Sequence, residues 1–186
     1  MTSDMTIEVH HIPTQGTRLD YVKPAEAFSV LKRLTEQGEC RFATPIAITL
    51  EVEPERDVIR VDGFLSATVR LPCSRCLNEY ERELHRRFTL RFSREIPADV
   101  HSGDDGEVEL TAAQIGLIYF KDDTIEFGDA VQEQIVLCLP YKPLCSDSCK
   151  GMCPQCGADL NQGPCGCPVK STGNPFDVLK DHQWPK

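Results

Sequence analysis

The chain has 186 residues, with 20 basic and 29 acidic side chains, and its formal net charge at pH 7 is −9. Such an acidic chain has no overall attraction for nucleic acid or anionic membranes, so only a local basic patch could provide one. No apolar run reaches the roughly 18–20 residues of a membrane span, and the polar start from Met1 to His10 lacks the apolar region of a signal peptide. We therefore expect a cytoplasmic protein without membrane contact.

The first half of the chain is dominated by alternating apolar residues, the pattern of half-buried strands. Alternation runs from Ile46 to Val52 and from Ile59 to Leu71, and a third alternating run spans residues 84–92. A Pro-containing break at residues 53–57 predicts a hairpin between the first two runs. Gly63 lies inside the second run, where we expect a β-bulge. The simplest arrangement of the three runs is an antiparallel meander.

Shorter patterns flank the meander. Four short strands are expected at residues 6–12, 107–110, 117–120 and 124–127, with a polar surface loop at residues 99–106. Apolar residues three apart after Pro24 predict a helix over residues 24–37. A second helix is predicted from Asp129 to Leu139, where Pro140 ends it.

After Pro140 the composition changes to Cys, Gly and Pro, which marks a boundary. We expect a metal-organised module over residues 144–168 and then a tail helix that begins at Asn174 and Pro175. The predicted fold class is therefore α+β. Residues 1–143 would form a small antiparallel β-meander or barrel-like domain with flanking helices, and residues 144–186 a C-terminal zinc-binding cysteine module with the tail helix.

Eight of the ten cysteines form four close pairs: Cys73 and Cys76, Cys145 and Cys149, Cys153 and Cys156, and Cys165 and Cys167. Disulfides need an oxidising compartment, for which the start of the chain gives no sign, so clustered thiols indicate metal ligands. A structural zinc takes four such ligands, so eight thiolates suit one or two Zn²⁺ ions. Iron–sulfur clusters also take thiolate ligands. Cys40 and Cys138 stand alone and are expected to be small buried apolar residues.

The four pairs can be matched in three ways. We favour one ion bound by Cys73, Cys76, Cys145 and Cys149, and another bound by Cys153, Cys156, Cys165 and Cys167. The second set closes a loop of only eight residues, at small entropic cost, and the first set would fasten the C-terminal segment to the meander. A zinc ribbon, in which Cys73 and Cys76 join Cys153 and Cys156, is the alternative.

No pattern indicates catalysis. A catalytic zinc keeps an open position and usually has His and carboxylate ligands, whereas the five histidines are scattered and none lies in an HExxH arrangement. Phosphate-binding, dinucleotide-binding and serine-hydrolase motifs are absent from the sequence. We expect a protein that is not an enzyme.

Charge is segregated along the chain. Residues 70–94 hold seven arginines against three glutamates, whereas residues 99–133 hold ten acids against Lys121 alone. Arginines beside a cysteine knuckle are able to bind phosphates, which position a protein on RNA without reading bases. A solvated surface explains the arginine block equally well. The candidate RNA contacts are Arg75, Arg82, Arg87 and Arg91.

Several motifs combine in an order that is informative as a set. They are Cys73-Ser-Arg-Cys76, the run from Leu139 to Cys145, the run from Cys149 to Asn161, Cys165-Gly-Cys167, and the segment from Asn174 to Leu179. Together they resemble the YceD family, whose members are called large ribosomal RNA subunit accumulation proteins. Met152 stands where the family usually has Leu, and Phe127-Gly128 where an Asp-Leu start is common, and neither change affects a ligand.

The resemblance implies a bacterial or organellar cytoplasmic protein needed for normal accumulation of 23S ribosomal RNA, without a known reaction of its own. The implied partners are 23S rRNA or its precursor and a large-subunit assembly intermediate. Some family members keep the first two cysteine pairs and lack the later cysteines, which supports the favoured grouping. The leading expectation is a non-enzymatic, RNA-binding ribosome-biogenesis factor. The alternatives are a zinc-stabilised protein–protein adaptor that uses the acidic stretch, and a redox-sensing thiol protein.

Overall fold

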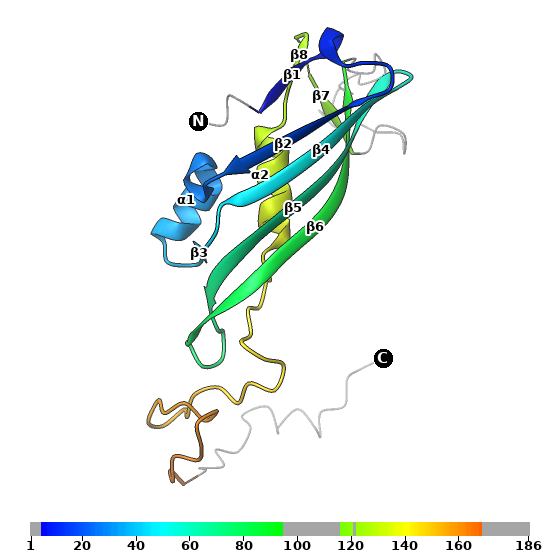
Figure 1. Ribbon diagram of the computed structural model, residues 1–186. Coiled ribbons are helices and arrows are strands. Elements are labelled where there is room, and N and C mark those ends of the chain that lie inside the picture. Colours follow the sequence, from blue (N-terminus) through cyan, green and yellow to red (C-terminus); the bar gives the residue numbers. More distant parts are fainter. Residues whose placement is uncertain (1–4, 95–115, 121, 169–186) are drawn as a thin grey trace, which may run out of the picture.

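The computed structural model describes residues 5–94, 116–120 and 122–168. Its main element is an open sheet of six strands, shown in Figure 1. These strands are β2 (Thr17–Lys23), β3 (Arg41–Phe42), β4 (Ile46–Glu55), β5 (Val58–Pro72), β6 (Glu79–Ser93) and β7 (Leu117–Tyr119). The order along the sheet is β2-β4-β5-β6-β7, and β3 pairs with β5. A separate two-stranded sheet joins β1 (Thr6–Glu8) to β8 (Thr124–Glu126).

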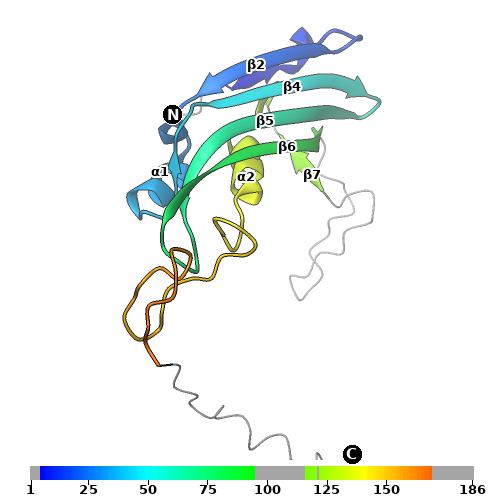
Figure 2. The same cartoon turned by 60° about the horizontal axis from the view of Figure 1, so that its bottom comes forward.

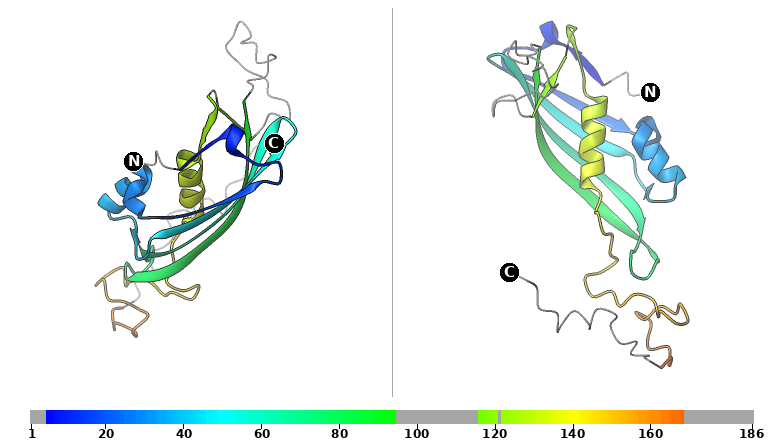
Figure 3. Two further views of the ribbon diagram at one scale, coloured as in Figure 1. Left: turned by 45° about the horizontal axis from the view of Figure 1, so that its top comes forward. Right: turned by 180° about the vertical axis from the view of Figure 1, so that it is seen from behind.

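The predicted antiparallel meander is confirmed, because β4, β5 and β6 are successive antiparallel neighbours. The barrel-like closure is wrong. Within the described part of the chain the sheet ends at β2 on one side and β7 on the other, and β7 joins β6 in parallel. The sheet curves around helix α2 (Gly128–Cys138) instead of closing on itself, as Figures 2 and 3 show.

Two helices supply the apolar partners of the sheet. Helix α1 (Ser29–Glu36) follows a short 3-10 turn at Ala25–Ala27, and a second such turn spans Val9–His11. Alternate residues of β4 and β5 are buried, and they form one core cluster with buried side chains of both helices. The largest buried side chains of this core include Phe28, Phe92 and Phe127. We call the opposite side of the β2-β4-β5-β6 sheet, which carries the exposed residues of each strand, the outer face.

A buried polar contact connects the helices. The Gln132 side-chain oxygen accepts hydrogen bonds from the backbone N–H of Val30 at 2.9 Å and from the Ser29 hydroxyl at 3.3 Å. The first N–H groups of a helix have no partner inside the helix, so this glutamine stands where a capping side chain would. It fixes the start of α1 against α2.

The β-bulge expected at Gly63 is absent, because β5 keeps its register there and Gly63 pairs with both Leu50 and Phe88. The glycine instead makes room for an aromatic ring. A Cβ added at Gly63 would lie 2.1–2.7 Å from three ring atoms of Phe88, closer than any contact between carbons allows.

Several boundaries differ between expectation and structure. Strand β2 was not predicted, and the first helix begins at Ser29 rather than at Pro24. The hairpin turn is shorter than the predicted break, since β4 extends to Glu55 and β5 starts at Val58. The strands predicted at 117–120 and 124–127 and the second helix are confirmed to within one residue at each end. The strand predicted at 6–12 is confirmed only over Thr6–Glu8, because Val9–His11 form a 3-10 turn. The loop at 99–106, the strand at 107–110 and the tail helix lie outside the described residues.

Among the described helices, none combines the length and apolar character that crossing a bilayer requires.

Candidate metal centres

The loop between β5 and β6 presents two cysteine sulfurs from one tight turn. The strands pair up to Pro72 and Glu79, which leaves six residues for the connection. Within it, the Leu77 N–H donates to the Cys73 carbonyl at 2.9 Å, and the Cys73 N–H donates to the Asn78 carbonyl at 3.0 Å. Leu77 adopts a φ of 60°, in the left-handed region, so that the chain can turn this sharply. This turn connects the second and third strands of the meander.

The first cysteine cluster joins this turn to the chain that follows α2. Its four sulfurs, those of Cys73, Cys76, Cys145 and Cys149, all lie within 4.8 Å of one another. The Cys73 and Cys149 sulfurs are 3.7 Å apart, and so are the Cys76 and Cys145 sulfurs. Cys145 is exposed and the other three are buried. This cluster is able to hold a metal ion, and it brings together residues about 70 positions apart in the chain.

Backbone contacts reinforce the same junction. The Arg75 guanidinium donates to the carbonyls of Cys149 at 2.8 Å and Asp147 at 3.4 Å. The Arg75 carbonyl in turn accepts from the Met152 N–H at 3.2 Å, and the Ser74 N–H donates to the Pro143 carbonyl at 2.8 Å. The C-terminal module is thus held against the β5–β6 loop from several sides of the first cluster.

Sequence reasoning did not single out a second set of contacts around this cluster. The Asn78 amide donates to the Asp159 carboxylate at 2.7 Å, and the Asn161 amide donates to the Cys149 sulfur at 3.5 Å. Hydrogen bonds to the Asp159 carboxylate hold the pKa of this group below its usual value. The Asn161 backbone N–H contributes most, and the Asn161 and Asn78 amides follow. Asn161 entered the sequence analysis only through the family resemblance, because nothing in its local spacing indicates a partner far away in the chain.

The second cysteine cluster lies wholly inside the C-terminal module. The sulfurs of Cys153, Cys156, Cys165 and Cys167 also lie within 4.8 Å of one another. The Gly157 N–H donates to the Cys153 carbonyl at 2.9 Å, which repeats the turn seen at the first cluster. Gly157 has a φ of 74°, a conformation that a glycine adopts without strain. Cys153 is buried, Cys156 is exposed and the other two are half-buried.

The eight sulfurs are therefore grouped as the loop-length argument favoured, and the ribbon grouping is not adopted.

Crowding of the sulfurs lowers the pKa of some thiols and raises the pKa of others. The N–H groups of Cys156 and Gln155 lower the pKa of Cys153 to about 6. At Cys73, burial opposes ionisation, but the N–H groups of Cys145, Cys76 and Arg75 outweigh it and lower the pKa to about 6.

In each cluster the pKa of one thiol is raised instead of lowered. Hydrogen bonding with Cys149 raises the pKa of Cys145 to about 12, and hydrogen bonding with Cys156 raises the pKa of Cys167 to about 12. Neighbouring thiolates repel a further negative charge, so each quartet loses its first proton readily and its last with difficulty. A bound cation is the usual means by which a protein keeps four thiolates together, because thiolate is the ligand form.

The two remaining cysteines lie apart from the clusters. Cys40 is buried in an apolar cluster with Val69, Leu71 and Leu84, as expected for a small apolar residue. Cys138 is half-buried and packs against the same cluster. Burial raises the pKa of both thiols.

The structure separates the four candidate arginines. Arg87 and Arg91 are exposed on the outer face of β6. Arg82 is exposed on the opposite side of the same strand, where its charge acts on Cys138 near the end of α2. Arg75 is part of the junction described above. Only Arg87 and Arg91 therefore share one surface.

A third group of ligand-type side chains lies near the N-terminus. The Glu8 carboxylate is 3.1 Å from a ring nitrogen of His10 and 3.1 Å from a ring nitrogen of His11. All three side chains are exposed, and the sequence pattern of the histidines gave no indication of this group. The contacts of Glu8 with both imidazole rings account for the arrangement.

Comparisons with known proteins point in one direction. The family model described as large ribosomal RNA subunit accumulation protein YceD matches residues 61–181. A chloroplastic protein of Zea mays, named large ribosomal RNA subunit accumulation protein YCED homolog 1, is 26% identical over 144 residues, covering 67% of this chain and 49% of the relative. The Arabidopsis thaliana protein of the same name is 24% identical over 141 residues, covering 67% and 44%.

An uncharacterized protein of Mycobacterium tuberculosis is 27% identical over 117 residues, which cover 63% of this chain and 52% of the relative. The chain thus spans about half the length of the curated relatives it matches. No solved structure matches it.

Proposed function

Because the chain belongs to the YceD family of large ribosomal RNA subunit accumulation proteins, we propose that it is a non-enzymatic factor that supports accumulation of 23S ribosomal RNA. It would act through contact with the RNA or its precursor, or with an assembly intermediate of the large subunit. The observation that carries the proposal is the family match over residues 61–181, which includes β5, β6 and both cysteine clusters.

The metal that suits these clusters is Zn²⁺. A tetrahedral zinc with Zn–S distances of about 2.3 Å has edges of about 3.8 Å between its sulfurs. Two sulfur pairs of the first cluster are 3.7 Å apart. Four cysteine ligands without histidine or carboxylate are typical of a structural zinc site, and the second cluster has the same ligand set. We infer one zinc ion in each cluster.

Four-thiolate sites favour a structural role. A zinc ion with four protein ligands has no open position for water or substrate, so neither cluster has the form of a catalytic centre. The first cluster would instead fix the C-terminal module to the end of the sheet, close to the loop that leads into the arginine-bearing strand β6. In this way the metal would hold a protein surface in shape for a partner.

Arg87 and Arg91 are the arginines that we propose contact the RNA. Both are exposed, and neither has a hydrogen-bond or ion-pair partner among the described residues. Phosphate contacts of this kind position a protein on RNA, and they weaken as the salt concentration rises because counterions are released on binding.

The proposal is tested by binding of a 23S rRNA fragment to the full chain over a range of salt concentrations. We expect binding to weaken with salt, and the double substitution R87Q/R91Q to reduce affinity and salt dependence together. Arg82→Gln is the matched control, since it removes the same charge from the opposite side of the same strand. Equal binding by the double variant and the wild-type chain would contradict the arginine contact.

A second candidate is a zinc-stabilised protein–protein adaptor. Leu77 is 61% exposed and Tyr141 is fully exposed, and both border a hollow of about 310 Å³ beside the first cluster. Large apolar side chains exposed together are typical of protein interaction sites. Five of the ten acids in the stretch that the sequence suggested for this interface lie outside the described residues. Retained binding of large-subunit proteins without any RNA binding would favour this candidate.

A further inference from the structure

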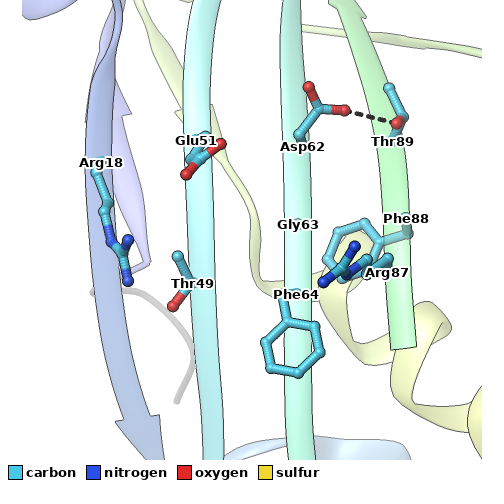
Figure 4. A pocket seen from close by; sticks show the side chains of 9 residues that line it. All are labelled: Arg18, Thr49, Glu51, Asp62, Gly63, Phe64, Arg87, Phe88 and Thr89. Carbon is cyan, nitrogen blue, oxygen red and sulfur yellow. Dashed lines mark hydrogen bonds between the residues drawn. The ribbon is translucent and has the colours of Figure 1, made fainter. Parts of the chain in front are cut away.

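The outer face carries a regular array of side chains from four strands. Register places Asp20, Thr49, Phe64 and Arg87 in one row across β2, β4, β5 and β6. The next row consists of Arg18, Glu51, Asp62 and Thr89. All residues of the two rows except Asp20 line a shallow hollow of about 730 Å³, shown in Figure 4. No described element covers this face, whereas α1 and α2 cover the other (Figure 2).

An aromatic ring stands at the centre of this open face. Phe64 is 39% exposed, although burying a phenylalanine side chain is favourable. Its ring lies nearly parallel to that of His85, with an angle of 9° and 6.3 Å between the ring centroids. The floor of the hollow beside it is the backbone at Gly63, with the Phe88 ring beneath. The face thus offers a flat aromatic surface next to an open space.

Some arginines around the hollow are paired with a carboxylate, and others have no such partner among the described residues. Arg18 is paired with Asp20 at 3.0 Å, and Arg60 is paired with Glu53. Arg87 and Arg91 have no partner among the described residues, and Arg87 is directly opposite Phe64 in the register. The two arginines are four positions apart along β6, which corresponds to about 13 Å.

One of these arginines is in an unfavourable position without an anion. Arg60 and Arg91 are directly opposite each other in the register, and both lie on the outer face. Like charges directly opposite on neighbouring strands destabilise a sheet. Arg60 pairs with Glu53 and also lies 3.6 Å from the Asp62 carboxylate, so Arg91 is the one of the two that lacks a negatively charged partner among the described residues. A phosphate group would supply that partner.

We propose that the outer face binds single-stranded RNA, with a base stacked on Phe64 and the backbone phosphates along Arg87 and Arg91. The proposal rests on the proposed function and identifies the form of RNA and the surface that binds it. Exposed aromatic rings on a sheet stack unpaired bases, whereas an RNA duplex buries the faces of its bases. The Glu51 carboxylate, on β4 across the hollow from β6, suits the amino groups of bases. The Asp62 carboxylate accepts a hydrogen bond from the Thr89 hydroxyl at 2.6 Å, beside the proposed phosphate path along β6.

The experiment measures fluorescence anisotropy of a short labelled RNA of mixed sequence, as a single strand and annealed to its complement, with the full chain. Phe64→Leu removes the ring but keeps an apolar side chain, and Phe64→Tyr keeps the ring. Tyr141→Leu is the control for loss of an exposed aromatic side chain elsewhere. Thermal unfolding of each variant reports whether the fold is intact.

We expect the wild-type chain to prefer the single strand. Phe64→Leu should weaken binding about five- to 100-fold, the range for loss of one stacked base, while Phe64→Tyr and Tyr141→Leu should leave it nearly unchanged. Replacing Arg87 and Arg91 by Gln should lower the slope of log affinity against log salt by about 0.7 for each phosphate that the chain no longer neutralises.

Two results would overturn the proposal in distinguishable ways. If the wild-type chain binds RNA but Phe64→Leu has no effect, or duplex binds as well as single strand, the stacking surface is wrong while RNA contact stands. If the wild-type chain binds neither form, direct RNA contact fails as well. Loss of binding to isolated large-subunit proteins on Phe64→Leu would then assign the outer face to a protein partner.

Discussion

Removing one ligand from each cysteine cluster should have different effects on the stability of the fold. Cys145→Ser and Cys156→Ser are a matched pair, because each replaces an exposed sulfur of its own cluster. Chain separation distinguishes the clusters: Cys76 and Cys145 are 69 positions apart, whereas Cys156 and Cys165 are separated by nine. In an unfolded chain, closing the longer loop costs about 1.8 kcal/mol more, which corresponds to about 20-fold in affinity.

The second cluster is therefore able to bind metal in the unfolded chain far better than the first. A ligand that binds only the folded state stabilises it, and at a free concentration 100 times the dissociation constant the effect is about 2.7 kcal/mol. For a chain of this size that corresponds to a rise in Tm of about 5–11 °C. We expect metal to produce such a rise through the first cluster and little or none through the second.

The assay is thermal unfolding of the full chain under reducing conditions, with buffered Zn²⁺ and after chelation. The wild-type chain and Cys156→Ser should both show the metal-dependent rise in Tm, and Cys145→Ser should lose it. The reasoning is refuted if Cys156→Ser loses as much of the rise as Cys145→Ser does, or if chelation leaves the wild-type Tm unchanged.

Three further predictions concern the support of these sites. Gly63→Ala should destabilise the fold by about 1–3 kcal/mol by overpacking against Phe88, and adding Phe88→Leu should recover part of the loss in urea unfolding; an unchanged midpoint would contradict the packing account. Gln132→Ala should lower the free energy of unfolding by about 0.5–1.5 kcal/mol because the partly buried Val30 N–H at the start of α1 loses its partner, whereas a neutral result would show that water replaces the side chain. The lowered pKa of Asp159 predicts that its hydrogen bonds from the Asn161 N–H and from the Asn161 and Asn78 amides add stability above about pH 3.8, and that this stability is lost as the pH falls through the lower folded value; the metal-free chain followed by amide NMR should show this change, and Asp159→Asn should abolish it.

The local part of the two cysteine clusters was predictable from the sequence. Close cysteine pairs define which sulfurs can share a turn, and the short loop between Cys156 and Cys165 favoured their common cluster. The meander followed from apolar alternation, since one face of β4, β5 and β6 is buried. Strand β2 has the same period, with Leu19 and Tyr21 turned inward, but its seven residues give a weaker signal and the strand went unpredicted.

Contacts that form only when distant segments of the chain pack together could not be predicted from the sequence. Arg75 was a candidate for RNA contact because it lies inside the first cysteine pair, and in the structure its guanidinium donates to the Cys149 and Asp147 carbonyls. No spacing rule indicates that bond, which forms only when the module lies against the β5–β6 loop. The parallel pairing of β7 with β6 is similarly long-range, and it is one reason why a closed barrel was a wrong expectation.

The central claim is that two separate four-thiolate sites hold metal and that one of them ties the C-terminal module to the sheet. Elemental analysis of the full chain, purified under reducing conditions, tests it most directly on the wild-type chain, Cys145→Ser and Cys156→Ser. The account predicts two zinc ions per wild-type chain and one in each single variant. A wild-type chain without zinc, or a single substitution that empties both sites, would contradict it.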